Sequence, residues 1–238
     1  MLKTIFTAFL LITASFTAQA DFSAAEKKEL NKLIEAYIIE HPEIVRESLI
    51  RLAEAEAVAR RENALSIVRN DAGDPFMGAG DNADIIIYEF SDYNCGYCKR
   101  VFGQLQAVLA EDDKVRLTLK EFPILSETSI IAAKAAIAAH RQGKFPEFHS
   151  GMMNWRGQVS LDMILSIAAE NGLDVGQLEA EMNSPDIDQI LNRTRAAAQA
   201  LEISGTPALV IGTEVVPGAV TAAEIKSIIA AQRAAQSG

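Results

Sequence analysis

The most constraining feature of the chain is a pair of cysteines, its only two, placed between an apolar run and a helix signal. Cys95 and Cys98 flank Gly96-Tyr97 and follow the apolar run 85–90. Backbone N–H groups at a helix start have no partner, and together with the helix dipole they favour a thiolate there. The pattern therefore predicts a strand, a reactive Cys-x-x-Cys turn and a helix, in that order.

The first twenty residues predict export across a membrane. Lys3 supplies a positive start, residues 5–16 form a short apolar stretch, and Ala18-Gln19-Ala20 is a small-residue cleavage pattern. We expect cleavage after about Ala20 and a periplasmic protein. The apolar stretch is short for a spanning helix, and an uncleaved N-terminal anchor is the alternative.

Composition excludes several functional classes. The formal net charge of -10 argues against nucleic acid and anionic lipid as partners. Half of the 238 residues are hydrophobic, at 49%, which allows a core without disulfide cross-links, and one Cys-x-x-Cys loop closes too few residues to stabilise a fold. The cysteine pair is therefore predicted to react. No histidine lies nearby to complete a metal site, so we expect no metal.

Residues 21–70 are predicted to form a helical oligomerisation segment. Ser23 and Glu26 fit a capping box, and Pro42 begins a second helix. The first helix carries an apolar stripe at helical spacing, and the second carries another: Leu30, Leu33, Ile34, Tyr37 and Ile38, then Val45, Leu49 and Leu52. Residues 70–81 have the composition of a linker, so these stripes are expected to pack against another copy rather than the chain's own core. The number of copies stays open.

Residues 71–238 are predicted to form an α/β domain divided by a helical insertion. Strand signals open and close this region, while about 126–202 carries helical signals alone. The expected elements are a strand 84–90, a helix 95–111, a strand 115–121, the insertion, short strands at 208–211 and 215–216, and a last helix capped by Thr221.

Three features together resemble the DsbA-like branch of the thioredoxin superfamily: Glu89-Phe90-Ser91-Asp92-Tyr93 before the cysteines, the long helical insertion, and Gly205-Thr206-Pro207 before a strand. The N-terminal helices and the Cys-Gly-Tyr-Cys sequence are most similar to ScsC-type oligomeric thiol:disulfide oxidoreductases. The resemblance implies a thioredoxin fold with an inserted helical domain, and disulfide formation or isomerisation in cysteine-containing exported proteins. It also implies a membrane redox partner and no cofactor beyond a redox-active Cys95–Cys98 disulfide.

The cysteines can be given roles from their positions. Cys95 precedes the helix and is expected to be the exposed attacking thiolate, whereas Cys98 lies one turn inside and is expected to resolve the mixed disulfide. The reverse sequence of steps oxidises a substrate dithiol. Gly96 and Tyr97 are expected to help set the reduction potential. A purely structural disulfide is the alternative.

The resemblance adds four supporting residues. It implies that Pro207 is cis and faces Cys95, with the backbone at Thr206 available to pair with an extended substrate; a trans proline that begins a strand is the alternative. Glu89 lies in an apolar strand, where a carboxylate is costly unless it is partnered or protonated. It matches the family's buried acid, a proton acceptor for Cys98, and Lys120 is its implied partner. An exposed pair at a sheet edge is the alternative.

Some alternatives remain open at the level of sequence. A copper-handling or chaperone-like protein could use the cysteine pair without turnover. Met152, Met153 and Trp155 could form an apolar surface for unfolded chains or belong to the core. His140 and His149 lie far from the cysteines in sequence and are expected to be ordinary surface or structural residues.

Overall fold

The computed structural model describes residues 22–236, so the predicted signal peptide and its cleavage site lie outside the described residues. The chain divides into two compact units, residues 1–55 and 56–238. Among residues 22–236, none of the helices combines the length and apolarity needed to cross a bilayer.

The first unit contains α1 (Ala24–Glu40) and the beginning of α2 (Pro42–Arg69). The predicted capping box is present, because Ser23 Oγ accepts from the backbone N–H of Glu26 and the Glu26 carboxylate accepts from that of Ser23. Every residue of α1 is exposed, including its apolar stripe, and so is the stripe of α2. Neither stripe has a buried partner in this unit.

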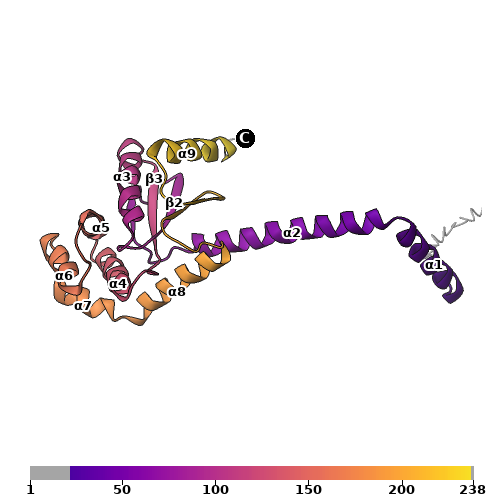
Figure 1. Ribbon diagram of the computed structural model, residues 1–238, viewed down its shortest axis with the longest axis horizontal. Coiled ribbons are helices and arrows are strands. Elements are labelled where there is room, and N and C mark those ends of the chain that lie inside the picture. The colour runs from indigo at the N-terminus through magenta and orange to yellow at the C-terminus, as the bar shows by residue number, and fades with distance from the viewer. Residues whose placement is uncertain (1–21, 237–238) are drawn as a thin grey trace, which may run out of the picture. The chain divides into compact units, whose positions relative to one another are not determined.

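The second unit is built on a mixed sheet of order β1-β3-β2-β4-β5. Figure 1 labels its central strands β2 and β3. Strand β2 (Ile85–Ser91), helix α3 (Gly96–Glu111) and strand β3 (Val115–Glu121) form the predicted βαβ unit, with the two strands parallel. The remaining strands run antiparallel to their neighbours: β1 (Phe76–Gly78), β4 (Ala208–Ile211) and β5 (Glu214–Pro217).

Residues 70–81 differ from the linker expected of them. Phe76–Gly78 pair with β3 as an edge strand, and Asp74 is buried. The end of α2 also belongs to the second unit, where Leu65 and Val68 are buried. Gly, Pro and Asp mark turns but do not exclude a three-residue strand between them, which is too short to show alternation.

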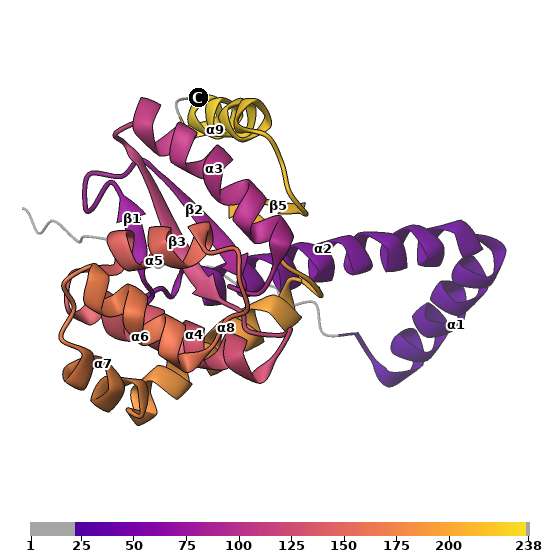
Figure 2. The same cartoon turned by 60° about the vertical axis from the view of Figure 1, so that its left-hand side comes forward.

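Helices cover both faces of the sheet. On one face, α3 and α9 (Ala222–Gln236) pack against residues such as Ile87 and Leu117; on the other, the end of α2 and α8 pack against Tyr88 and Phe90. The insertion supplies the helices grouped beside the sheet in Figure 2: α4 (Glu127–Arg141), α5 (Phe145–Asn154), α6 (Leu161–Glu170), α7 (Val175–Met182) and α8 (Pro185–Ala200). The architecture is the predicted α/β domain divided by helices.

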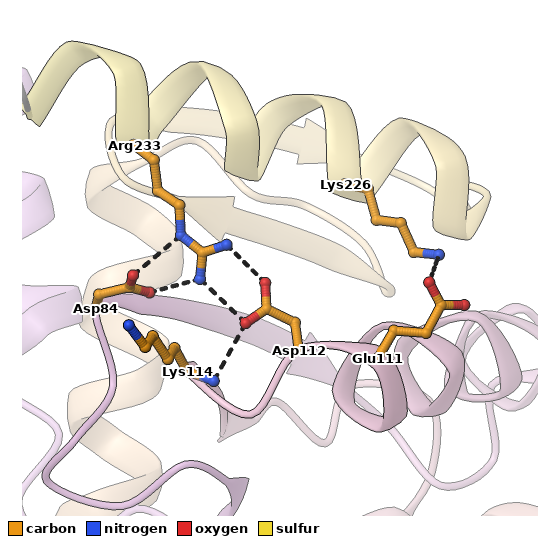
Figure 3. Close-up of polar contacts among 6 residues, drawn as sticks. All are labelled: Asp84, Glu111, Asp112, Lys114, Lys226 and Arg233. Carbon is orange, nitrogen blue, oxygen red and sulfur yellow. Dashed lines mark hydrogen bonds and ion pairs between the residues drawn. The ribbon is translucent and has the colours of Figure 1, made fainter.

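Two sets of ion pairs attach α9 to the rest of the unit (Figure 3). The Arg233 guanidinium donates to Asp84 just before β2, at 2.7 and 3.0 Å, and to Asp112 just after α3, at 2.6 Å. Lys226 pairs with Glu111 at the end of α3. The Arg233 guanidinium binds each carboxylate through two nitrogens, so its contacts are more directional than the single contact of Lys226. They hold α9 beside the helix that carries the cysteines.

Candidate active site

Cys95 is the N-cap of α3, so its thiol lies where the first backbone N–H groups of the helix have no intrahelical partner. Its own N–H donates to Asp92 O at 2.9 Å, and its thiol donates to Thr206 O at 3.2 Å. The thiol is less exposed than predicted, because the loop that carries Thr206 covers it and only 7% of the residue is accessible. It is still the more accessible of the two cysteines.

Cys98 lies in the first turn of α3 and is fully buried. Both cysteines are free thiols in this structure. Burial raises the pKa of the Cys98 thiol, and the nearby Glu89 carboxylate raises it further. Cys98 therefore needs a proton acceptor before it can attack a disulfide.

The loop opposite Cys95 contains the second predicted element. The Thr206–Pro207 peptide bond is cis, as the family resemblance implied, and Thr206 O is the acceptor for the Cys95 thiol. A pocket beside this loop is lined by Ile203, Gly205, Thr206, Pro207 and Val215 among others. The loop thus brings the backbone carbonyl of Thr206, and the pocket beside it, next to the Cys95 sulfur.

Glu89 is fully buried in β2, and neither of its carboxylate oxygens has a hydrogen-bond partner among the described residues. Burial raises the pKa of Glu89 to about 8, while the Ser91 hydroxyl lowers it by a smaller amount. Its charge in turn raises the pKa of the Cys98 thiol. A carboxyl with this pKa can accept and return a proton near neutral pH.

The predicted pairing of Lys120 with Glu89 is wrong. Side chains alternate along a strand, and Glu89 lies opposite Leu119 in the parallel register, so Lys120 points to the other face of the sheet. There, fully buried, its Nζ lies 2.5 Å from Asp74 Oδ2, and Arg193 also binds Asp74. Lys120 therefore anchors the segment before β1 and α8 rather than the redox site.

Asp92 organises the turn before Cys95, a role that the sequence analysis missed. Its Oδ1 accepts from the Asn94 N–H and the Ser129 hydroxyl, and its Oδ2 accepts from the N–H groups of Ile124 and Leu125. An Asp two residues before an Asn is a signal for such a side-chain turn. The contacts join the cysteine loop to the chain after β3 and to α4.

A second buried polar group was also missed. Tyr93, next in the loop, lies with its hydroxyl 2.8 Å from His149 Nδ1 on α5 and 3.2 Å from Glu121 Oε1 at the end of β3. All three residues are buried. His149 was expected to be an ordinary surface or structural residue. Its position beside the cysteine loop was not predicted, because Tyr93 and His149 are 56 residues apart in sequence.

The dipeptide between the cysteines lies at the rim of the site. A Cβ on Gly96 would meet no atom within 4 Å, and Tyr97 is exposed with the Arg100 guanidinium 3.9 Å above its ring. Lys99 donates to Trp155 O at 2.8 Å. Lys99 and Arg100 thus place two basic side chains near the start of α3, in a chain of net negative charge.

The Met152-Met153 pair belongs to the core, since both side chains are fully buried, whereas Trp155 is 40% exposed. Of the two uses foreseen for this cluster, burial in the core applies to the methionines. Within the part of the chain that the structure describes, no group of three or more His, Cys, Asp or Glu side chains is arranged to hold a metal ion.

Comparison with known families agrees with this geometry. The profile of the DSBA-like thioredoxin domain matches residues 86–230, which include the cysteine motif, the helical insertion and the Thr206–Pro207 loop. The chain belongs to this family. Its fold is accordingly the predicted thioredoxin fold with an inserted helical domain.

Solved structures of DsbA-like proteins match at similar levels. A thioredoxin-like oxidoreductase from Silicibacter pomeroyi is 37% identical, with a TM-score of 0.67 over 70% of this chain and 96% of that one. A linker-deletion mutant of Proteus mirabilis ScsC is 26% identical, with a TM-score of 0.66 over 91% of this chain and 99% of that one. The thiol-disulfide exchange protein α-DsbA2 of Wolbachia pipientis is 26% identical, with a TM-score of 0.66 over 71% and 91%.

Curated relatives of the DsbA-like chain are longer proteins. The Na(+)/H(+) antiporter NhaA of Herminiimonas arsenicoxydans is 26% identical over 154 residues, which are 64% of this chain and 25% of that protein. The chain thus spans about a quarter of the length of the curated relatives that it matches.

Proposed function

We propose that the protein is an exported thiol:disulfide oxidoreductase that acts on cysteine-containing proteins through Cys95 and Cys98. The observation that carries the proposal is the position of the Cys95 sulfur, at the start of α3 and 3.2 Å from Thr206 O. Helix N-termini favour the thiolate as nucleophile or leaving group. The cis-proline loop beside it offers backbone groups with which an extended substrate segment can pair.

The exchange follows from the relative exposure of the two sulfurs. Cys95 attacks a substrate disulfide, forms a mixed disulfide and releases one substrate thiol. Cys98, deprotonated with Glu89 as the proton acceptor, then attacks Cys95, releases the second substrate thiol and closes the Cys95–Cys98 disulfide. In the opposite direction, the same steps transfer this disulfide to a substrate dithiol. Gly96 and Tyr97 adjust the balance between the two directions.

The decisive experiment compares insulin reduction by the full-length wild type with that by the Cys98→Ser variant. The wild type is expected to turn over repeatedly when an external dithiol reduces the Cys95–Cys98 disulfide after each cycle. The variant is expected to stop as a covalent mixed disulfide, because Cys95 can still attack but nothing resolves the product. Cys95→Ser is the matched control and should form no adduct. Absence of both turnover and adduct would reject the proposal.

We further propose that residues 23–70 assemble copies of the chain, which would favour isomerisation over simple oxidation. Support comes from the exposed apolar side chains of α1 and α2, among them Leu33 and Ile39, which are 62% and 72% accessible. Reactivation of scrambled ribonuclease by the reduced protein measures isomerase activity. A membrane redox partner would then keep Cys95 and Cys98 reduced, whereas an oxidase would need one that reoxidises them.

Copper handling remains the competing function for the same cysteine pair. Soft Cu(I) prefers thiolate ligands, and two buried thiols one helical turn apart are available to it. Titration with Cu(I) beside the insulin assay separates the alternatives. Tight binding without turnover would favour the binding protein, and turnover in the presence of a copper chelator would favour the oxidoreductase.

A further inference from the structure

Two buried carboxyl groups share one face of the sheet on neighbouring strands. In the parallel register Glu89 lies opposite Leu119 and Ser91 lies opposite Glu121, so the two glutamates are diagonal neighbours on the face that α3 covers. Glu89 is 0% exposed and Glu121 is 2% exposed. Neither forms an ion pair with any residue between 22 and 236. Two unpaired carboxylates so placed cannot both ionise without a large cost.

The surroundings of Glu121 carry more negative charge than those of Glu89. Burial raises the pKa of Glu121 well above its usual value; the Tyr93 hydroxyl opposes this effect, and Asp92, Glu89 and Asp74 add to it. Asp74 is itself bound by Lys120 and Arg193 on the far face of the sheet. Burial and these neighbouring carboxylates therefore both favour the protonated form of Glu121.

The contact between Tyr93 and Glu121 is longer than a usual hydroxyl–carboxylate bond and longer than the contact between Tyr93 and His149. The two oxygens are 3.2 Å apart, whereas a hydroxyl that donates to an ionised carboxylate is usually about 2.5–2.7 Å from it. The Tyr93 oxygen is closer to His149 Nδ1, at 2.8 Å. The shorter contact thus leads to the histidine.

One hydroxyl proton cannot serve both acceptors, so the three residues have two possible arrangements. With Glu121 ionised, Tyr93 donates to it and His149 donates from Nδ1–H. With Glu121 protonated, the bond runs the other way, from Glu121 to Tyr93, and Tyr93 donates to Nδ1. The ring proton then lies on Nε2, which is buried and has no hydrogen-bond partner among the described residues. Burial lowers the pKa of His149 to about 3, so the ring is neutral and carries a single proton at neutral pH. The tautomer of His149 therefore reports the protonation state of Glu121.

We propose that Glu121 is a protonated positioning residue of the redox site: through Tyr93 it holds the loop before Cys95 against α5, and it leaves Glu89 as the carboxyl that changes charge during exchange. Tyr93 lies between Asp92, whose carbonyl accepts from the Cys95 N–H, and Asn94, whose amide reaches α4. Fixing its ring therefore fixes the turn that presents the nucleophile. The role in exchange rests on the proposed function, while the protonation state does not.

The test is ¹⁵N NMR of the histidine rings in the reduced, full-length protein. The chain has three histidines, so His41→Gln and His140→Gln variants assign the His149 signals. We expect an unprotonated Nδ1 and a protonated Nε2 at neutral pH. A protonated Nδ1 would mean an ionised Glu121 and would overturn the proposal. Tyr93→Phe should change the Nδ1 shift, and an unchanged shift would show that the bridge is absent.

A second readout tests whether Glu121 carries a charge near the cysteine pair. Glu121→Gln replaces one neutral group with another, so the equilibrium constant with glutathione should stay within about twofold of the wild type at neutral pH. If Glu121 were ionised, losing its charge would favour the dithiol form by about tenfold or more, and the proposal would fail. The two proposals can fail separately. If the wild type is inactive in the insulin assay but His149 is protonated at Nε2, only the proposed function is rejected.

Discussion

In the proposed mechanism, Glu89 receives the proton that Cys98 must lose before it resolves the mixed disulfide. Its pKa of about 8 suits that exchange, and no basic side chain fixes its charge within residues 22–236. We expect Glu89→Gln to slow release of the mixed disulfide by roughly 100-fold, at the low end for general base catalysis. Rapid-quench measurement of the second exchange step checks this, and an unchanged rate would remove the proton-acceptor role.

Lys120 provides the matched control for that experiment, because it is equally buried but lies on the opposite face of the sheet. Lys120→Met leaves Asp74 with Arg193 as its remaining cation. Breaking a buried pair costs about 3–5 kcal/mol of folding stability. The exchange rate of the folded fraction should stay near the wild-type value.

Burial of neutral Glu89 also makes folding stability depend on pH. The pKa of Glu89 in the folded protein, about 8, is above the ordinary glutamate value of 4.5, so between these two pH values the folded state binds a proton that the unfolded chain does not. Its contribution to stability is full below about pH 4.5 and is lost as pH rises through 8, by on the order of 4 kcal/mol. Urea unfolding at pH 5 and 8.5 should show a smaller loss in Glu89→Gln than in the wild type; equal losses would contradict the burial argument.

The positions of individual site residues could be predicted from the sequence where a local pattern determines them. Cys95 and Cys98 follow an apolar run, and Glu89 within that run had to be buried. The partner of Lys120 was predicted wrongly although strand alternation alone separates it from Glu89. His149 could not be placed beside Tyr93 because their contact depends on how the insertion packs, which no local pattern specifies.

Among the elements, β1 is the part of residues 70–81 that joins the sheet, and a substitution at Gly78 can test this pairing. Gly78 has φ of +83°, and a Cβ there would lie 2.6 Å from Val115 O on the neighbouring strand. We expect Gly78→Ala to cost about 1–3 kcal/mol of stability because both the backbone conformation and the strand pairing are disturbed. Gly80→Ala, whose Cβ would meet no atom within 4 Å, is the control and should change stability by less than about 0.5 kcal/mol.

If Gly78→Ala unfolds in urea at the same midpoint as Gly80→Ala, the pairing of β1 with β3 contributes little. The short strand also shows which elements the sequence could predict. The residues of β3 alternate over seven positions and its bounds agree with the prediction, whereas the three residues of β1 carry no period to detect. Long periodic elements were predictable, and short edge strands were not.

For the whole molecule, the end of α2 decides where an oligomerisation segment can be removed. Leu65 and Val68 are fully buried against the sheet, so the chain separates after residue 55 rather than at the predicted boundary near 70. A variant containing residues 56–238 should fold and keep insulin reduction, and light scattering should give the mass of a monomer if residues 23–55 mediate assembly. An unchanged number of copies would reject that role.

The variant 71–238 should behave differently, because it lacks the two side chains that cover Tyr88 and Phe90. Removing a buried Leu and a buried Val costs about 1.5–3 kcal/mol each in transferred apolar surface. We expect a lower urea midpoint than for 56–238, together with aggregation from the newly exposed sheet face. Equal midpoints for the two variants would mean that the end of α2 does not stabilise this domain. If both variants lose isomerase activity while 56–238 keeps insulin reduction, isomerisation depends on the assembled copies. Thiol–disulfide exchange itself then needs only the domain of residues 56–238.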